Sequence, residues 1–586
     1  MMNSAVVTPD PDVPSAPVAW SLTRREAWLS ALLVFAVALG VRLLAAAIID
    51  FPKPEDTAYY VGAARNLVEG RGLVSDALWS FGTPPLVFPR PAFEVWLPLP
   101  TILAAIPMAL FAGPAPIPLD AAMRTSQVVP VLAGSIVSVL AWRLAADVAL
   151  ERGLSIERGR TLALGTGIAS SVYLPLVLHS ALPDSTLLFG ALVLGAGLLM
   201  TRVLQAPRGG RWRDPRLLGI GLLLGLSALT RNEAVWLALV WAWLAWRLRD
   251  EPRPVRLRLI AVVAVVAVLV FAPWAVRNWF VFGNPLPGQA ISNAMSVTGF
   301  DIFAWNDRPT LSRYLAVGPA GLLEMRLTGL AHNLFNVLLL LGVPMSLVGL
   351  VALPWQGRGR AVRPILLVSL LTFLVTSLLF PVATTWGTFL HAAVPAHVLL
   401  LLSGLGALDA GIARLGRRLG WDKPVAWLGP LLAIFASLLF SVALLPSFGG
   451  GGRATERQYE VLARQMAAIG APFDDSAPVI HDFPIWLAET ERVRSLALPN
   501  ESPSDVLDLA NEFGARWLIS TGDDHGAWPA ILDGDDPAAA CFEEVLLPIP
   551  DDPEDAAAIE AFRVFRIECQ GVARAVVPEP ASGRSP

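Results

Sequence analysis

Four side chains that are far apart in the sequence carry groups suited to phosphate chemistry. Asp56 and Asp184 supply carboxylates, and Arg231 and Arg277 supply guanidinium groups. A carboxylate can take a proton from an attacking hydroxyl or hold a divalent cation. Arginine is always charged, and its forked donors fit a phosphate. Together these four residues are suited to displacing a phosphate leaving group.

Five further polar residues are candidates. Each lies close in the sequence to one of the first four residues or, like them, at the end of an apolar run. They are Glu55, Tyr59, Tyr60, Asn278 and His391. Simpler interpretations also exist. An Asp that follows a proline, as Asp184 does, is a common helix N-cap. An isolated Arg at a membrane interface often only extends its charged head toward water.

The elements that must position these residues are apolar helices. Of the 586 residues, 55% are hydrophobic and only 16% are charged, whereas a soluble domain carries about 25% charge. This composition excludes a disordered chain, a nucleic-acid binder and an ordinary cytosolic enzyme. Apolar runs of about 17–25 residues, the length that crosses roughly 30 Å of hydrocarbon, recur at 27–49, 95–113, 124–149, 160–179, 184–204, 215–230, 233–249, 257–277, 332–353, 364–380, 387–407 and 425–446.

The arginine-rich loops indicate the orientation of these runs, because short loops rich in Arg stay cytoplasmic. If all twelve runs crossed, the basic loop 151–160 would fall outside. We therefore predict that 95–113, which Pro98, Pro100 and Pro107 interrupt, is a re-entrant or interfacial segment. Eleven crossings then place the N-terminus in the cytoplasm of a bacterium and the C-terminal part outside its plasma membrane.

This topology brings every candidate residue to the outer ends of the helices. The long outer loops are 50–123 and 278–331, and the cytoplasmic loops are all short. Ionisable residues at membrane ends are costly and often functional. An outward-facing site is therefore expected.

The net charge of −4 hides an asymmetry that agrees with a membrane body and an exposed appendage. Residues 1–452 hold 34 Lys and Arg against 23 Asp and Glu, whereas residues 453–586 hold 10 against 25. We predict a cytoplasmic N-terminal tail at 1–23, a transmembrane domain at 24–448, and a flexible glycine-rich linker at 449–453. An extracytoplasmic α/β domain at 454–575 and a disordered tail at 576–586 would follow.

The predicted α/β domain has five strands and one clearly marked helix. The strands are "APVIHDF", "RVRSLALP", "ARWLIST", "CFEEVLLPI" and "FRVFRIEC". Ser502 as N-cap, Pro503 in the first turn and Gly514 past the end delimit the helix. The only two cysteines, Cys541 and Cys569, would face each other if residue 542 paired with 568 and residue 545 with 565. They form either a disulfide, which an outer compartment permits, or two buried thiols.

Four stretches around the candidate residues resemble the GT-C superfamily of membrane glycosyltransferases, especially protein O-mannosyltransferases and the aminoarabinose transferases of lipid A. They are "PEDTAYYVGAARNLVEGRGL", "LPDSTLLFGALVL", "GLLLGLSALTRNEA" and "PWAVRNWFVFGNPLP", within about residues 24–446. The resemblance implies a fold of eleven to thirteen spans with juxtamembrane helices in the first outer loop. It also implies a donor made of a polyprenyl phosphate bearing one sugar, with inverting transfer on the outer face.

Carried over to this sequence, the resemblance implies that Asp56 is the catalytic base and Asp184 the second acid. Arg231 and Arg277 would meet the donor phosphate. The sequence departs from the family pattern in two places. Relatives often have Asp-Glu where this chain has Glu55-Asp56, so either acid can be the base, and many have Arg-Tyr where this chain has Leu390-His391.

The resulting hypothesis is a polyprenyl-phosphate-dependent glycosyltransferase of the hexosyl or pentosyl type. Its acceptor would be a hydroxyl or amine on a lipid, glycan or protein. The only cofactor to consider is a divalent cation, with Asp56 and Asp184 as its ligands if one is bound. The competing hypothesis is a transporter or flippase of a lipid-linked solute. Transporters often show internal repeats and polar residues at mid-membrane, and neither is evident in the sequence.

Overall fold

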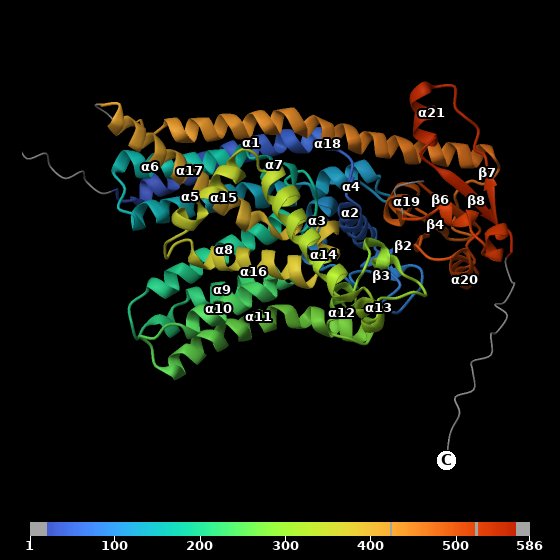
Figure 1. Ribbon diagram of the computed structural model, residues 1–586, viewed down its shortest axis with the longest axis horizontal. Helices are drawn as coiled ribbons and strands as arrows, with labels where there is room; N and C mark the ends of the chain where they lie inside the picture. The colour runs from blue at the N-terminus through green and yellow to red at the C-terminus, as the bar shows by residue number, and fades with distance from the viewer. Residues whose placement is uncertain (1–19, 422–424, 522–525, 570–586) are drawn as a thin grey trace, which may run out of the picture.

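The computed structural model describes residues 20–421, 425–521 and 526–569, so the predicted tail at 576–586 and most of that at 1–23 lie outside the described residues. A body of nearly parallel and antiparallel helices occupies one side of the molecule, and a mixed α/β domain occupies the other (Figure 1). The helices of the body are α1 (Arg24–Ile48), α5 (Val128–Glu151), α6 (Ile156–Val172), α7 (Leu174–Leu178), α8 (Thr186–Gln205), α9 (Arg216–Ala228), α10 (Ala234–Trp246), α11 (Arg253–Phe282), α14 (Gly318–Ala331), η3 (His332–Leu340), α15 (Met345–Gln356), α16 (Arg363–Leu379), α17 (Val394–Arg418) and α18 (Leu428–Ala468).

Large apolar side chains face outward along the helical body. On α11, Val268, Leu269 and Phe280 are 64%, 67% and 82% exposed. Exposing a large contiguous apolar surface to water is unfavourable, so side chains of this kind are expected to face the hydrocarbon of a membrane. The body is therefore a membrane domain, as the composition predicted.

Six helices in the described part of the chain are long and apolar enough to cross a membrane. A seventh span results if α14 with η3 is joined to α15, although the axis bends by 112° between Leu340 and Met345. The apolar run predicted at 332–353 therefore contains this bend. Shorter apolar helices of 10–17 residues are α9, α10 and α16 in the body and α3 (Leu99–Phe111) in the first loop. The number of eleven crossings remains a prediction.

The basic loops that set the predicted orientation lie together at the end of the body remote from the α/β domain. Arg160 pairs with Glu26 near the start of α1, and Arg158 pairs with Asp409 on α17. Arg152 donates to the backbone oxygen of Gln356 at 2.6 Å. We call the other end, where the α/β domain lies, the sheet end (Figure 1).

Both long loops at the sheet end contain short elements. The first loop holds α2 (Glu55–Val68), β1 (Val74–Ser75), β2 (Ala77–Leu78), β3 (Arg90–Pro91), α3 and α4 (Leu119–Ser126), and the second holds α12 (Ala290–Ala294), η2 (Gly299–Phe303) and α13 (Leu311–Ala316). The second loop is shorter than the predicted 278–331, because α11 continues to Phe282 and α14 already begins at Gly318.

The α/β domain contains a six-stranded sheet in the order β2-β5-β4-β6-β8-β7. Its elements are β4 (Val479–His481), α19 (Pro484–Glu491), β5 (Ser495–Ala497), α20 (Pro503–Phe513), β6 (Trp517–Ser520), η7 (Ala530–Asp533), η8 (Pro537–Cys541), β7 (Phe542–Val545), α21 (Pro553–Ile559) and β8 (Arg563–Ile567). All five expected strands are present. The expected helix is α20, with the Ser502 side chain accepting from the backbone N–H of Asp505 and Gly514 in the left-handed conformation.

The sheet departs from the sequence-based picture at its edge and in its register. Strand β2 comes from the first loop and pairs with β5, Ala77 opposite Ser495, so the segment 454–575 does not form the domain alone. In the pair of last strands, Phe542 faces Ile567 and Val545 faces Val564, which is one residue away from the predicted register. Cys541 and Cys569 form a disulfide.

The flexible linker predicted at 449–453 is wrong. Helix α18 runs without a break for 41 residues from the membrane body into the α/β domain, along the top of Figure 1. The glycines allow close packing at this point: a Cβ on Gly449 would overlap the backbone oxygen of Ile48, whereas a Cβ on Gly450 has no atom within 4 Å. Glycine is a weak helix former. In this run, however, the absence of a side chain lets α1 and α18 approach each other closely.

This difference between neighbouring glycines yields a matched pair of variants. Gly450→Ala should stabilise the protein by about 0.8–1.0 kcal/mol, because alanine is the better helix former and meets no neighbour. Gly449→Ala should lower the melting temperature, because its methyl group displaces α1. Thermal unfolding in detergent, followed by tryptophan fluorescence, measures both. Equal shifts for the two variants would contradict a continuous, packed α18.

Candidate active site

The imidazole of His391 stands between two carboxylates at the sheet end of the membrane body. Its Nε2 lies 3.0 Å from Oδ2 of Asp56, and its Nδ1 lies 3.6 Å from Oδ2 of Asp184. Asp56 is in the first turn of α2, Asp184 lies just before α8, and His391 is in the turn η5 (Leu390–Ala392) before α17. Three segments separated by more than a hundred residues thus meet at one ring.

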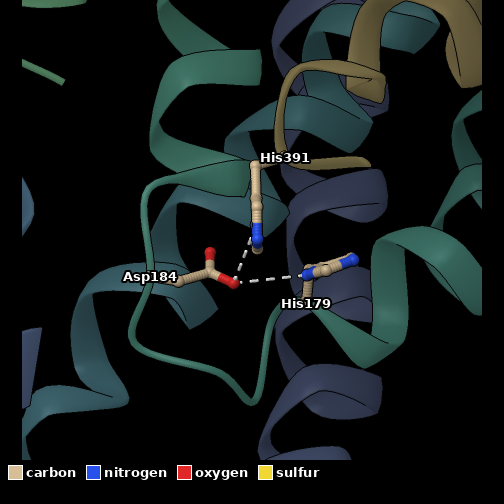
Figure 2. A group of neighbouring side chains, drawn as sticks. All are labelled: His179, Asp184 and His391. Atoms are coloured by element: carbon tan, nitrogen blue, oxygen red, sulfur yellow. Dashed lines mark hydrogen bonds and ion pairs between the residues drawn. The ribbon is translucent and has the colours of Figure 1, made fainter. Parts of the chain in front are cut away.

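Asp184 uses its two oxygens differently. Oδ1 accepts from the backbone N–H of Thr186 at 2.7 Å. One oxygen of Asp184 therefore does bind the start of α8, as the helix N-cap interpretation expected. Oδ2 faces His391 and also Nδ1 of His179, 3.4 Å away, as Figure 2 shows. His179 follows α7 and was not predicted, although its position five residues before Asp184, in the same short turn, was an available signal.

The donor atoms of His179, Asp184 and His391 lie within 4.8 Å of one another. A tetrahedral Zn²⁺ with bonds of about 2.0–2.2 Å requires ligand atoms about 3.3–3.6 Å apart. The separations of 3.4 and 3.6 Å from Asp184 to the two imidazoles fit this requirement, and the two imidazole nitrogens lie within 4.8 Å of each other. Two imidazoles and one carboxylate suit Zn²⁺ or Mn²⁺ better than Mg²⁺. In this structure His391 Nδ1 has a hydrogen bond of 2.7 Å with Thr186 Oγ1, and this bond would have to break before Nδ1 could bind a cation.

This geometry separates Asp56 from the candidate metal ligands. If Nδ1 of His391 held a cation, Nε2–H would donate to Asp56, which is the arrangement in which a carboxylate orients a metal-bound histidine. Asp56 and Asp184 bind opposite nitrogens of one ring. A metal site formed by Asp56 with Asp184 stays a prediction, and His179, Asp184 and His391 form a second candidate ligand set.

Glu55 turns away from this cluster. Its Oε1 accepts from the backbone N–H of Ile485 at 3.0 Å, in the first turn of α19. Burial is the main cause that raises the pKa of Glu55 to about 8, and Asp482 adds to the effect. Of the two adjacent acids, only Asp56 reaches His391.

Arg231 lies next to the cluster and faces a cavity. Its Nη1 donates to Oγ of Ser185 at 2.8 Å, one residue after Asp184. Its Nη2 pairs with Oε1 of Glu233 at 2.9 Å and donates to the backbone oxygen of Thr388. This guanidinium is therefore held rigidly between α8, α10 and the turn before α17.

The cavity beside Arg231 has a volume of ≈ 430 Å³ and both polar and aromatic walls. Its lining includes Tyr60, Glu94, Trp96, Arg231, Glu233, Trp236, Asn278, Gln289 and Asn293. The two long loops close one side together, because Nε2 of Gln289 donates to Oγ of Ser80 at 2.7 Å. A cavity of this size and lining is typical of a small-molecule site.

Three predicted residues occupy different positions around this cavity. Asn278 lines it. Arg277 instead stacks its guanidinium on Trp274, 4.6 Å from the ring centre, and donates to Asn278 Oδ1. The Tyr59 hydroxyl accepts from the backbone N–H of Phe93 and donates to Glu94. Within the described residues, Tyr59 and Arg277 stay outside the cavity lining.

The arrangement joins a half-buried carboxylate, a candidate cation site and a fixed guanidinium that lines one cavity. Asp56 contacts His391, and Arg231 contacts Ser185, the residue after Asp184. Such a site can deprotonate one group while stabilising negative charge on another, which is the requirement for displacing an anionic leaving group.

No protein-family model and no curated protein matches the sequence. Solved structures with similar folds exist. The oligosaccharyltransferase AglB from Archaeoglobus fulgidus, in complex with an inhibitory peptide and a dolichol-phosphate, has a TM-score of 0.55 and 12% identity over 91% of this chain and 77% of that one. An oligosaccharyltransferase from the same organism was also solved with Zn and sulfate, with a TM-score of 0.53 and 14% identity over 88% and 71%.

The aminoarabinose transferase-type protein ArnT from Cupriavidus metallidurans, bound to undecaprenyl phosphate, has a TM-score of 0.52 and 15% identity. The similarity covers 92% of this chain and 98% of that one. It therefore includes the helical body and most of the α/β domain. The fold expected from the sequence motifs is confirmed: the chain shares the overall fold of AglB and ArnT.

Proposed function

We propose that this protein transfers a sugar from a polyprenyl-phosphate donor to an acceptor hydroxyl or amine at the sheet end of the membrane body, with inversion at the anomeric carbon. The observation that carries the proposal is the meeting of Asp56, His391, Asp184 and Arg231 beside one cavity. The lipid phosphates held by AglB and ArnT support a donor of the same class. A bacterial plasma membrane, with this end outside, completes the proposal.

In the proposed step, the acceptor gives its proton to Asp56 as its oxygen or nitrogen attacks the anomeric carbon. The bond from that carbon to the phosphate oxygen breaks, and polyprenyl phosphate leaves as an anion. His391 orients the Asp56 carboxylate, and Arg231 receives the developing negative charge. A fixed donor of this kind commonly contributes about 2.7–4 kcal/mol to the transition state.

The other predicted residues take supporting parts. Asn278 presents its side chain to the cavity and would bind the donor directly, while Arg277 would add positive charge from behind it. Tyr60 would line the sugar site. His179, Asp184 and His391 would hold a divalent cation, which when bound adds positive charge beside the donor phosphate.

Replacing Asp56 tests the base. Asp56→Asn keeps the shape but removes the proton acceptor, so turnover should fall by about 100- to 10,000-fold. Glu55→Gln is the matched control: Gln resembles the protonated acid that the raised pKa favours, and activity should stay within about threefold. The measurement is release of polyprenyl phosphate from synthetic lipid-phosphate sugars in membranes that contain the protein.

Two outcomes would contradict this assignment. Full activity of Asp56→Asn would exclude it as the base, and loss of activity only in Glu55→Gln would transfer the role to Glu55. Lipid scrambling by the purified protein, with no release of polyprenyl phosphate by the wild type, would favour the flippase hypothesis.

A second pair of variants tests the phosphate ligand. Arg231→Gln should lower kcat by about 100- to 1,000-fold, because the donor that meets the leaving charge is lost. Arg277→Gln should cost less than about tenfold, since its guanidinium is stacked on Trp274. The same release assay, run over a range of donor concentrations, separates kcat from KM. Equal losses for the two variants would contradict the separate roles.

The candidate cation site is tested by metal content. The wild-type protein, purified after exposure to Zn²⁺ or Mn²⁺ and desalted, should retain about one equivalent by mass spectrometry, and His179→Gln should lose it, because the remaining two protein ligands bind weakly. His397→Gln is the control, since His397 is buried against Tyr173 instead. Metal content that is the same in both variants would contradict the site.

A further inference from the structure

The helix that carries Asp56 is held along its length by the α/β domain. At its start, Glu55 accepts from the Ile485 N–H of α19 at 3.0 Å. Just before it, the backbone oxygen of Pro52 accepts from Nε1 of Trp486 at 3.1 Å. Helix α19 therefore fixes the first turn of α2, in which Asp56 lies.

The last turn of α2 contains a buried ion pair with the same helix. The guanidinium of Arg65 pairs with the carboxylate of Glu489, and both side chains are only 3% and 4% exposed. Nη2 of Arg65 also donates to the backbone oxygen of Glu489 at 2.9 Å. Gly62 lies beneath this carboxylate, and a Cβ there would overlap it. The pair thus sets both the distance and the register between α2 and α19.

The far end of α2 has a third contact. Arg492, directly after α19, makes two hydrogen bonds of 2.7 Å to the carboxylate of Glu69. The first loop then continues into β2, which joins the edge of the sheet beside β5. Helix α2 is consequently attached to the α/β domain at its start through Glu55 and at its end through Arg65 and Glu69.

We propose that Arg65 and Glu489 are positioning residues, through which the α/β domain holds α2 so that Asp56 reaches His391. The α/β domain would thus serve to position α2. Only the expected loss of kcat rests on the proposed function. Asp56 meets His391 through one 3.0 Å contact, so a small displacement of α2 breaks it. A misplacement of about 1 Å in a catalytic site can cost about 100-fold in rate.

The test is Glu489→Gln in the full-length protein. Removing one partner of a buried ion pair leaves the other charge uncompensated and is strongly destabilising. Hydrogen exchange of peptides that cover residues 55–68 should therefore accelerate by at least tenfold, while peptides from α8 stay unchanged. In the polyprenyl-phosphate release assay, kcat should fall by about 10- to 100-fold with KM for the donor changed less than about threefold.

Two further variants keep the test decisive. Glu543→Gln is the matched control in the same domain, because Glu543 pairs with Arg566 on exposed strands away from α2; exchange and kcat should match the wild type. In Arg65→Gln/Glu489→Gln, two amides replace the pair and no charge remains buried without a partner. Breaking a buried ion pair is costly mainly because of the uncompensated charge that it leaves, so the double variant should recover most of the protection of α2.

The outcomes separate this inference from the proposed function. Accelerated exchange in α2 with a lower kcat supports the inference, and so does accelerated exchange in a protein whose wild type shows no transfer, in which case only the proposed function fails. Unchanged exchange of residues 55–68 in Glu489→Gln overturns the inference, whatever the activity. Exchange that accelerates equally throughout the α/β domain and is not recovered in the double variant also overturns it.

Discussion

The site depends on one imidazole that lies between two carboxylates. His391 can contact Asp56 and Asp184 together only if α2, the turn before α8 and the turn before α17 lie close together at the sheet end of the body. Burial makes this convergence demanding, since an ionisable group that loses its partner in a low-dielectric setting is costly. The helical body supplies two of these segments directly. The third, α2, lies in a loop outside the body and needs a separate support.

The α/β domain provides that support and is not an independent appendage. It receives α18 as a continuous helix, takes β2 from the first loop into its sheet, and pairs with α2 through Glu489 and Arg492. It also holds the second loop, because the Glu501 carboxylate accepts from the backbone N–H groups of Trp305, Asn306 and Asp307. Both loops that line the cavity are thus fixed by the same domain.

Most residues that meet at the candidate site could be singled out from the sequence, whereas the connections between the domains could not. Asp56, Asp184, Arg231 and His391 were found because apolar runs reveal which polar residues stand at helix ends, and arginine-rich loops group those ends by side. His179 was overlooked because a lone histidine in a short turn has no periodic signal. Strand β2 has two residues and pairs with β5 far along the chain, and the glycine run of α18 includes Gly449, which packs against Ile48 at the end of α1. Such features depend on tertiary contacts that no local pattern encodes.

The proposed function requires a lipid phosphate bound at the sheet end beside Arg231. The most direct test is a structure of the protein in a lipid nanodisc with a polyprenyl phosphate. We expect phosphate density about 3 Å from the Arg231 guanidinium, the distance of a charge-assisted hydrogen bond, in the cavity that Asn278 and Tyr60 also line. Phosphate bound at the opposite end of the body, in the cavity lined by Arg202 and Arg360, would contradict it.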